Sequence, residues 1–67
     1  MPFINIKMAG PEPTKEQKQE LISQITQTMV SVLGKKRERV QIYIETFDAS
    51  SIGTGGMSLE NVLKESK

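Results

Sequence analysis

Two short stretches of alternating apolar and polar residues flank one longer amphipathic stretch. Residues 2–8 and 39–46 alternate in this way, which is the pattern of a strand with one dry face. Between them, residues 14–33 carry apolar side chains at helical spacing (Leu21, Ile22, Ile25, Met29, Val32 and Leu33). A strand, a helix and a strand at this spacing predict a β-α-β unit with parallel strands and a right-handed crossover.

Turn and capping residues mark the ends of these elements. Residues 10–13 read Gly-Pro-Glu-Pro, which leaves few backbone donors and predicts a loop after the first strand. Thr14, followed three residues later by Gln17, predicts a capping box at the start of the helix. Gly34 stands where a left-handed C-cap belongs. The glycine-rich residues 52–56 predict a hairpin or a bulged short strand.

The chain is small and contains no cysteine that could form a disulfide. Its 67 residues make one domain and include no Cys, and a domain of this size buries only roughly 60% of its unfolded surface. One helix covers one face of a two-stranded sheet, and Phe3, Tyr43 and Phe47 fall on the other face. Because parallel sheets are normally covered on both sides, we predict a homo-oligomer that assembles through the sheet.

The composition excludes several classes of function. The absence of His and Cys removes the commonest acid–base side chain, thiol nucleophiles and nearly every zinc, haem or iron–sulfur site. The net charge is +1 with both signs interleaved, which gives no electrostatic case for nucleic acid. Residues 1–20 lack an apolar signal core, and no apolar run is long enough to span a bilayer. We therefore expect a cytosolic protein without nucleic-acid, membrane or metal partners.

Pro2 is the strongest candidate for chemistry. If Met1 is trimmed, Pro2 carries a free secondary amine, and an α-amino group titrates near pH ~7.7–8.0. An apolar pocket or a nearby cation lowers that pKa further, and a general base works best when its pKa lies near the working pH. The alternative is that position 2 simply holds a proline, as in many cytosolic proteins.

Taken together, these features resemble the small-subunit tautomerases of the 4-oxalocrotonate tautomerase group, from Pro2 to about residue 62. The resemblance is carried by five features: Met1-Pro2 before an apolar strand, Glu16-Gln17-Lys18 opening the helix, Leu21-Ile22 on its buried side, the Val40–Ile44 strand, and Gly53-Thr54-Gly55-Gly56. It implies an α/β fold: a single tautomerase-like domain over 1–67, with a β-α-β subunit, a C-terminal hairpin and a homohexamer built as a trimer of dimers.

The resemblance also implies an activity. The protein would be a tautomerase, an isomerase that moves a proton between carbon atoms of an unsaturated enol or 2-oxo acid such as a 2-hydroxydienoate. Pro2 would be its general base, and neither a metal nor an organic cofactor would be needed. A catalytically inactive homo-oligomeric scaffold, or a binding protein of the same fold, is the alternative.

Three positions depart from the family's pattern. The loop after the first strand has no arginine and carries Glu12, while Gln41 replaces a second arginine and Ile52 replaces an aromatic residue. Both carboxylate clamps are therefore missing, which favours monocarboxylate or less charged substrates over dicarboxylates. If Arg39 lies in the second strand, it shares a face with Gln41 roughly 6.6 Å away and could hold a carboxylate. The favoured alternative is that Arg39 is a solvated residue at the strand entry.

Overall fold

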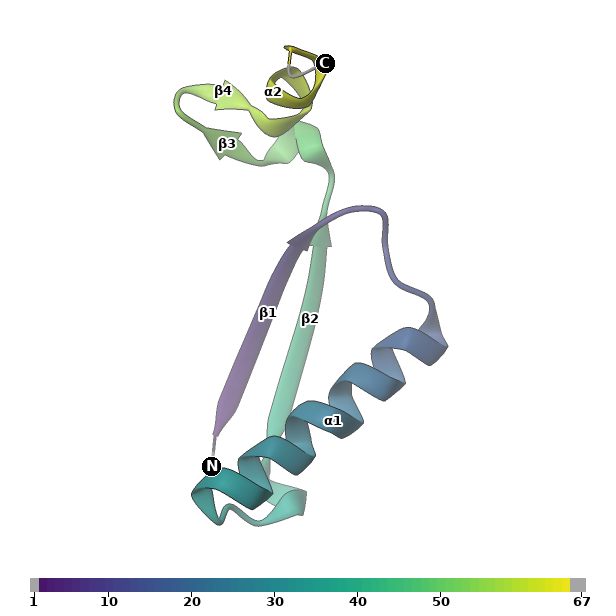
Figure 1. Cartoon of the computed structure of the whole chain (residues 1–67), viewed down its shortest axis with the longest axis vertical. Coiled ribbons are helices and arrows are strands. Elements are labelled where there is room, and N and C mark those ends of the chain that lie inside the picture. The colour runs from purple at the N-terminus through teal and green to yellow at the C-terminus, as the bar shows by residue number, and fades with distance from the viewer. Residues whose placement is uncertain (1, 66–67) are drawn as a thin grey trace.

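The computed structural model describes residues 2–65 of the chain. Six elements and two short 3-10 turns follow one another: β1 (Phe3–Ala9), α1 (Lys15–Leu33), η1 (Arg37–Arg39), β2 (Gln41–Phe47), η2 (Ala49–Ser51), β3 (Gly53–Thr54), β4 (Met57–Ser58) and α2 (Leu59–Glu65). The parallel β1–β2 pair, the single long helix between them and the C-terminal hairpin confirm the predicted fold class (Figure 1). Within residues 2–65, no helix combines the length and apolar composition needed to cross a membrane.

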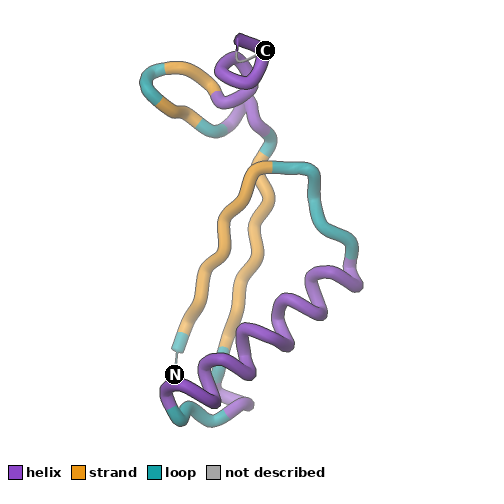
Figure 2. Tube along the Cα trace, in the orientation of Figure 1, coloured by secondary structure: helices purple, strands orange, loops and turns teal. Residues whose placement is uncertain are grey.

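β1 and β2 run in parallel, in a register that pairs Phe3 with Gln41 and Ala9 with Phe47. Along β1, and along β2 as far as Thr46, exposure alternates residue by residue, as a pleated sheet with one covered face requires. The half-buried face carries Ile4, Ile6 and Met8 from β1 and Ile42, Ile44 and Thr46 from β2. The sheet therefore has one apolar side, and α1 runs back along the strands to reach the start of β2 (Figures 1 and 2).

The strand boundaries differ from the predicted ones. β1 begins and ends one residue later than the predicted 2–8, and β2 begins at Gln41 rather than at 39. The cause is η1, in which the backbone N–H of Arg39 donates to the carbonyl of Lys36 at 2.9 Å. This local bond keeps residues 37–39 from extending, so the expectation that Arg39 lies in the strand is wrong.

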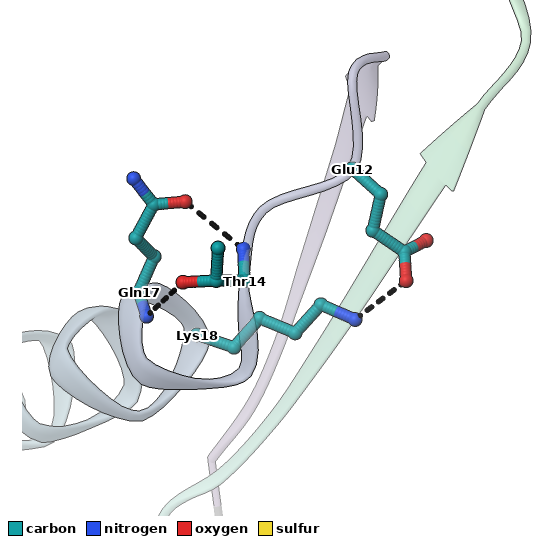
Figure 3. A network of polar contacts seen from close by, with 4 residues as sticks. All are labelled: Glu12, Thr14, Gln17 and Lys18. Carbon is teal, nitrogen blue, oxygen red and sulfur yellow. Dashed lines mark hydrogen bonds and ion pairs between the residues drawn. The ribbon is translucent and has the colours of Figure 1, made fainter.

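Both predicted ends of α1 are confirmed. The Thr14 backbone N–H donates to Gln17 Oε1 at 2.9 Å, and the Gln17 N–H donates to Thr14 Oγ1 at 3.1 Å (Figure 3). These two bonds form the capping box and satisfy donors that the first turn of a helix leaves free. At the other end, Gly34 adopts φ 67°, a left-handed conformation that favours glycine.

The predicted hairpin is also confirmed. Gly55 and Gly56, between β3 and β4, both have positive φ, at 62° and 87°. Two consecutive positive φ values are those of a type I′ turn, whose twist matches that of the flanking strands. The base of the hairpin is closed by a 2.7 Å bond from the Leu59 N–H to the Ile52 carbonyl.

The protomer is extended and has little interior. No hydrophobic side chain among residues 2–65 is buried, and Thr26 is the one buried residue in that range. The radius of gyration is 15.5 Å, whereas a compact domain of this length would have about 11 Å. The chain exposes 5203 Å², whereas about 4,200 Å² is expected of a compact monomer of its mass. The protomer therefore leaves apolar surface for another molecule to cover.

Exposed apolar side chains lie on both layers of the protomer. Phe3 and Tyr43, on the sheet face opposite the half-buried one, are 61% and 50% exposed. Val32 and Leu33 of the predicted helical stripe are exposed as well, while the rest of that stripe is half-buried. The protomer therefore covers the stripe from Leu21 to Met29 and leaves its C-terminal end open.

The capping box leads to the first prediction. Thr14→Ala removes the hydroxyl that accepts from Gln17, so the free energy of unfolding should fall by about 1 kcal/mol. Thr14→Ser keeps a hydroxyl at the same place and should retain most of that stability. Urea denaturation followed by circular dichroism, at one fixed protomer concentration, measures both variants. Equal losses in the two variants would contradict the role of the cap.

Candidate functional site

Pro2 lies immediately before β1 and against the first residue of β2. Its carbonyl accepts a hydrogen bond from the Gln41 N–H at 3.0 Å, and its side chain is half-buried. This bond is the first of the ladder between the two strands. It therefore ties the backbone of Pro2 to the sheet. Met1, which the sequence interpretation expects to be removed, lies outside the described residues.

Gln41 and Tyr43 form a polar pair on the sheet face that also carries Phe3. They are two residues apart in β2 and so project from the same face of the sheet. The Tyr43 hydroxyl donates to Gln41 Oε1 at 2.9 Å. This bond occupies the amide oxygen, and the amide nitrogen of Gln41 has no hydrogen-bond partner within residues 2–65. Sequence reasoning favoured an interface role for Tyr43 over a hydrogen bond to substrate and did not pair it with Gln41, although the two-residue spacing was the available signal.

Arg39 lies near this end of the sheet but not on the strand. Because η1 is a 3-10 turn, strand alternation does not align the Arg39 side chain with that of Gln41. Arg39 is exposed, and its side chain has no hydrogen bond or ion pair within the described part of the chain. Its neighbour Arg37 donates to Gln27 Oε1 of α1. With Lys35 and Lys36, these arginines place four cations within five residues, just before the strand that contacts Pro2.

Ile52 lies at the other end of the sheet. The strands separate it from Pro2 by about 20 Å, since Ile52 follows the end of β2 and Pro2 precedes the start of β1. Ile52 lines a groove of about 480 Å³ together with Met8, Phe47 and Leu59, and Lys7 also contributes to its wall. One protomer therefore brings Pro2 and Gln41 together but does not bring Ile52 to them.

The loop that would carry the first arginine holds an ion pair instead. Glu12 accepts from Lys18 Nζ of α1 at 3.0 Å (Figure 3). Both side chains keep contact with solvent, so the pair contributes little stability. Its consequence is electrostatic: the loop presents a neutralised carboxylate, not a free cation, to any ligand that approaches.

A short turn after β2 positions Ile52. The Asp48 carboxylate accepts from the Ser50 hydroxyl and from the Ser50 backbone N–H, the latter at 3.1 Å. Both bonds favour the ionised carboxylate, the hydroxyl contributing more, and they hold the pKa of Asp48 below its usual value. η2 is thereby capped, and the chain passes from it through Ile52 into β3.

Comparison with known proteins gives a consistent result. A profile of a family described as "Tautomerase enzyme" matches residues 2–61. A probable tautomerase of Campylobacter jejuni is 44% identical over 62 residues, which cover 92% of this chain and 91% of the relative. DmpI from Helicobacter pylori, known from a crystal structure, is 40% identical to this chain and superimposes on it with a TM-score of 0.80. The match covers 90% of this chain and 98% of the DmpI chain.

A more distant structure shares the fold. It is a heterohexameric 4-oxalocrotonate tautomerase from Chloroflexus aurantiacus, 21% identical, with a TM-score of 0.77. The match covers 92% of this chain and 98% of that one. At this level of identity the likeness concerns the arrangement of the elements.

The Asp48 turn leads to the second prediction. A carboxyl whose pKa is lowered in the folded state stabilises that state at pH values above its unfolded pKa, and the contribution is lost as pH falls through the lowered pKa. Ser50→Ala removes the larger cause, so the Asp48 pKa should rise toward the ordinary 3.8. Carboxyl NMR titration of both proteins measures the shift. An unchanged midpoint would show that the hydroxyl does not hold the carboxylate.

Proposed function

Because the chain belongs to the tautomerase family, we propose that it is an isomerase of enols and unsaturated 2-oxo acids with Pro2 as its general base. One observation carries the proposal: the family match begins at Pro2, the residue that the sheet holds against Gln41. A catalytic base must be held in a defined place to reach one proton of its substrate. The bond from the Gln41 N–H to the Pro2 carbonyl, the first of the β1–β2 ladder, supports such a role for Pro2.

The proposed mechanism needs only one basic nitrogen. Removal of Met1 frees the secondary amine of Pro2, whose pKa lies near ~7.7–8.0 before any perturbation. The neutral amine takes a proton from one position of the conjugated acid, and the electron pair shifts along the double bonds. The protonated amine then returns the proton to another carbon, so no cofactor is consumed.

The charges around Pro2 favour a weakly charged substrate. Gln41 offers a neutral amide where an arginine would grip a carboxylate, and Glu12 is paired with Lys18. Arg39 is the candidate cation, and as part of an exposed turn it would attract an anion without a rigid bidentate contact. We therefore assign substrate contacts to Gln41, Arg39 and Ile52, and a monocarboxylate as the preferred substrate.

The proposed enzyme is a homo-oligomer, a hexamer built as a trimer of dimers. Three observations support assembly: the absence of buried hydrophobic side chains among residues 2–65, the exposed Phe3 and Tyr43 on the sheet, and the expanded shape of the protomer. The heterohexamer from Chloroflexus aurantiacus shows that this fold can assemble with six subunits. In such an assembly, Ile52 would reach a Pro2 of another copy, which the length of one sheet prevents within a protomer.

A second candidate is a homo-oligomeric scaffold or binding protein without catalysis. The observation that favours it is the absence of both arginine clamps from a site that otherwise keeps Pro2. The two candidates differ in what they require of Pro2, because only the enzyme needs its nitrogen.

The third prediction tests that requirement. Pro2→Ala replaces the ring amine, and the rate of arylenolpyruvate ketonisation should fall by about 10²–10⁴-fold. Ultraviolet absorbance follows the reaction, and circular dichroism with sedimentation confirms that the variant keeps its fold and assembly. An unchanged rate would show that Pro2 is not the base, and a wild-type protein that does not accelerate the reaction would favour the scaffold. Intact-mass measurement of the wild type should show the loss of one methionine, since retained Met1 leaves Pro2 as an amide.

The fourth prediction concerns substrate charge. Wild-type protein should have a higher kcat/KM for an arylenolpyruvate, which has one carboxylate, than for a 2-hydroxydienedioate, which has two. Gln41→Arg supplies a charge-assisted donor and should shift the ratio toward the dicarboxylate by roughly tenfold. Gln41→Met, a neutral side chain of similar length, is the control and should produce no such shift. A strong dicarboxylate preference in the wild type would contradict the prediction.

A further inference from the structure

We propose that the basic end of the protomer is an interaction surface for the acidic C-terminal unit of a second copy of this chain. The basic end comprises residues 32–39, and the acidic unit comprises residues 48–65. The inference rests on the homo-oligomer of the proposed function, which it deepens by naming two surfaces that meet between copies.

The charges of the chain are segregated between these two segments. Four cations and one anion give the basic end a net charge of +3: Lys35, Lys36, Arg37, Arg39 and Glu38. Three anions and one cation give the acidic unit a net charge of −2: Asp48, Glu60, Glu65 and Lys64. The ion pair between Glu12 and Lys18 lies outside both segments, and neither segment contains an ion pair within residues 2–65.

The two segments lie at opposite ends of the protomer. η1 lies beside the start of β2, whereas η2, the hairpin and α2 follow the end of β2 (Figure 1). The long axis of the protomer measures 45 Å, and α2 has its main contacts with η2, β3 and β4. Because the Debye length is about 10 Å at about 0.1 M salt, the two ends do not neutralise each other within one protomer. A second copy can bring the opposite charges together.

Each segment also exposes apolar side chains next to its charges. Val32 and Leu33 are 72% and 56% exposed and directly precede the cations of the basic end. Leu63 of α2 is 59% exposed, and it lies three positions after Glu60, so the two share a helical face. Apolar contact at the centre of an interface contributes affinity, and complementary charge selects the partner. The two surfaces match in both respects.

A second copy fits this pattern because every copy carries both surfaces. In a closed assembly, each copy can place its basic end on the acidic unit of one neighbour and accept the basic end of another copy in return. Contacts between like ends would bring charges of one sign together, which opposes association. The charges therefore determine which ends of neighbouring copies meet.

Exchange of charge between the two ends tests the pairing on the full-length protein. Lys35→Glu with Lys36→Glu changes the net charge of the basic end to −1, and Glu60→Lys with Glu65→Lys changes that of the acidic unit to +2. Each variant alone then has two ends of the same sign, so its protomer concentration at half-assembly should rise at least about tenfold. An equimolar mixture of the two variants has opposite signs at every mixed contact and should assemble within about threefold of the wild type. Sedimentation velocity over a dilution series at about 0.1 M salt measures each sample.

A matched control separates charge pairing from a general effect of charge. Glu16→Lys with Glu20→Lys adds the same charge as the reversal in α2, at exposed positions of α1 outside both segments. This control should assemble within about threefold of the wild type. The deficit of the two end variants should also shrink at about 1 M salt, where the Debye length is about 3 Å. A deficit caused by misfolding would persist at high salt.

Four results would overturn the inference. They are a wild-type protein that stays monomeric, end variants that assemble like the wild type, a mixture that assembles no better than its components, and a deficit that persists at about 1 M salt. If an end variant is unfolded alone by circular dichroism, the mixture must recover both fold and assembly. Binding of polyglutamate by the wild type, together with a mixture that fails to assemble, would assign the basic end to a foreign acidic partner.

The result is distinguishable from the fate of the proposed catalysis, because sedimentation needs no substrate. If Pro2→Ala leaves the rate unchanged while the mixture assembles, the assignment of the base fails and the contact between copies stands. If Pro2→Ala abolishes the reaction while the mixture does not assemble, the reverse is true.

Discussion

The parallel pairing of β1 with β2 is the constraint on which the rest of the structure depends. Its first bond joins the Gln41 N–H to the Pro2 carbonyl at 3.0 Å, so the same ladder that makes the sheet also positions the proposed base. A slip of one residue would send every side chain of β2 to the opposite face. Gln41 and Tyr43 would then face α1, and Ile42 would face solvent. The register of the two strands therefore decides which side chains are available on the face that carries Gln41.

A single helix on a two-stranded sheet has a second consequence. One sheet face is half-buried and the other carries exposed Phe3 and Tyr43, so residues 2–65 of a single protomer bury no apolar side chain. A domain of this size without crosslinks depends on further burial, and another copy of the chain is the proposed source of it. Ile52, about 20 Å from Pro2 along the sheet, belongs to the same argument. Assembly would supply stability and complete the proposed site in one step.

The distribution of charge sets the character of that site. The cations of the segment 35–39 lie in and beside an exposed turn, the loop carboxylate of Glu12 is paired with Lys18, and the donor next to Pro2 is a neutral amide. The cations attract an anion over a distance, whereas the neutral amide binds it more weakly on contact than an arginine would. This is the physical basis for proposing substrates with one carboxylate.

Sequence alone determined the elements and their order, because periodicity, the capping box from Thr14 and the glycine turn act over a few neighbouring residues. It also singled out Pro2, and the resemblance to the tautomerases pointed to the missing arginines, since both are matters of residue identity. The tertiary structure decided what depends on local competition and on contacts across elements. The bond from the Arg39 N–H to the Lys36 carbonyl keeps Arg39 in a 3-10 turn and out of the strand. The hydroxyl of Tyr43 donates to the amide oxygen of Gln41. Alternation along a strand shows which side chains share a face, but only three-dimensional geometry shows which of them bond.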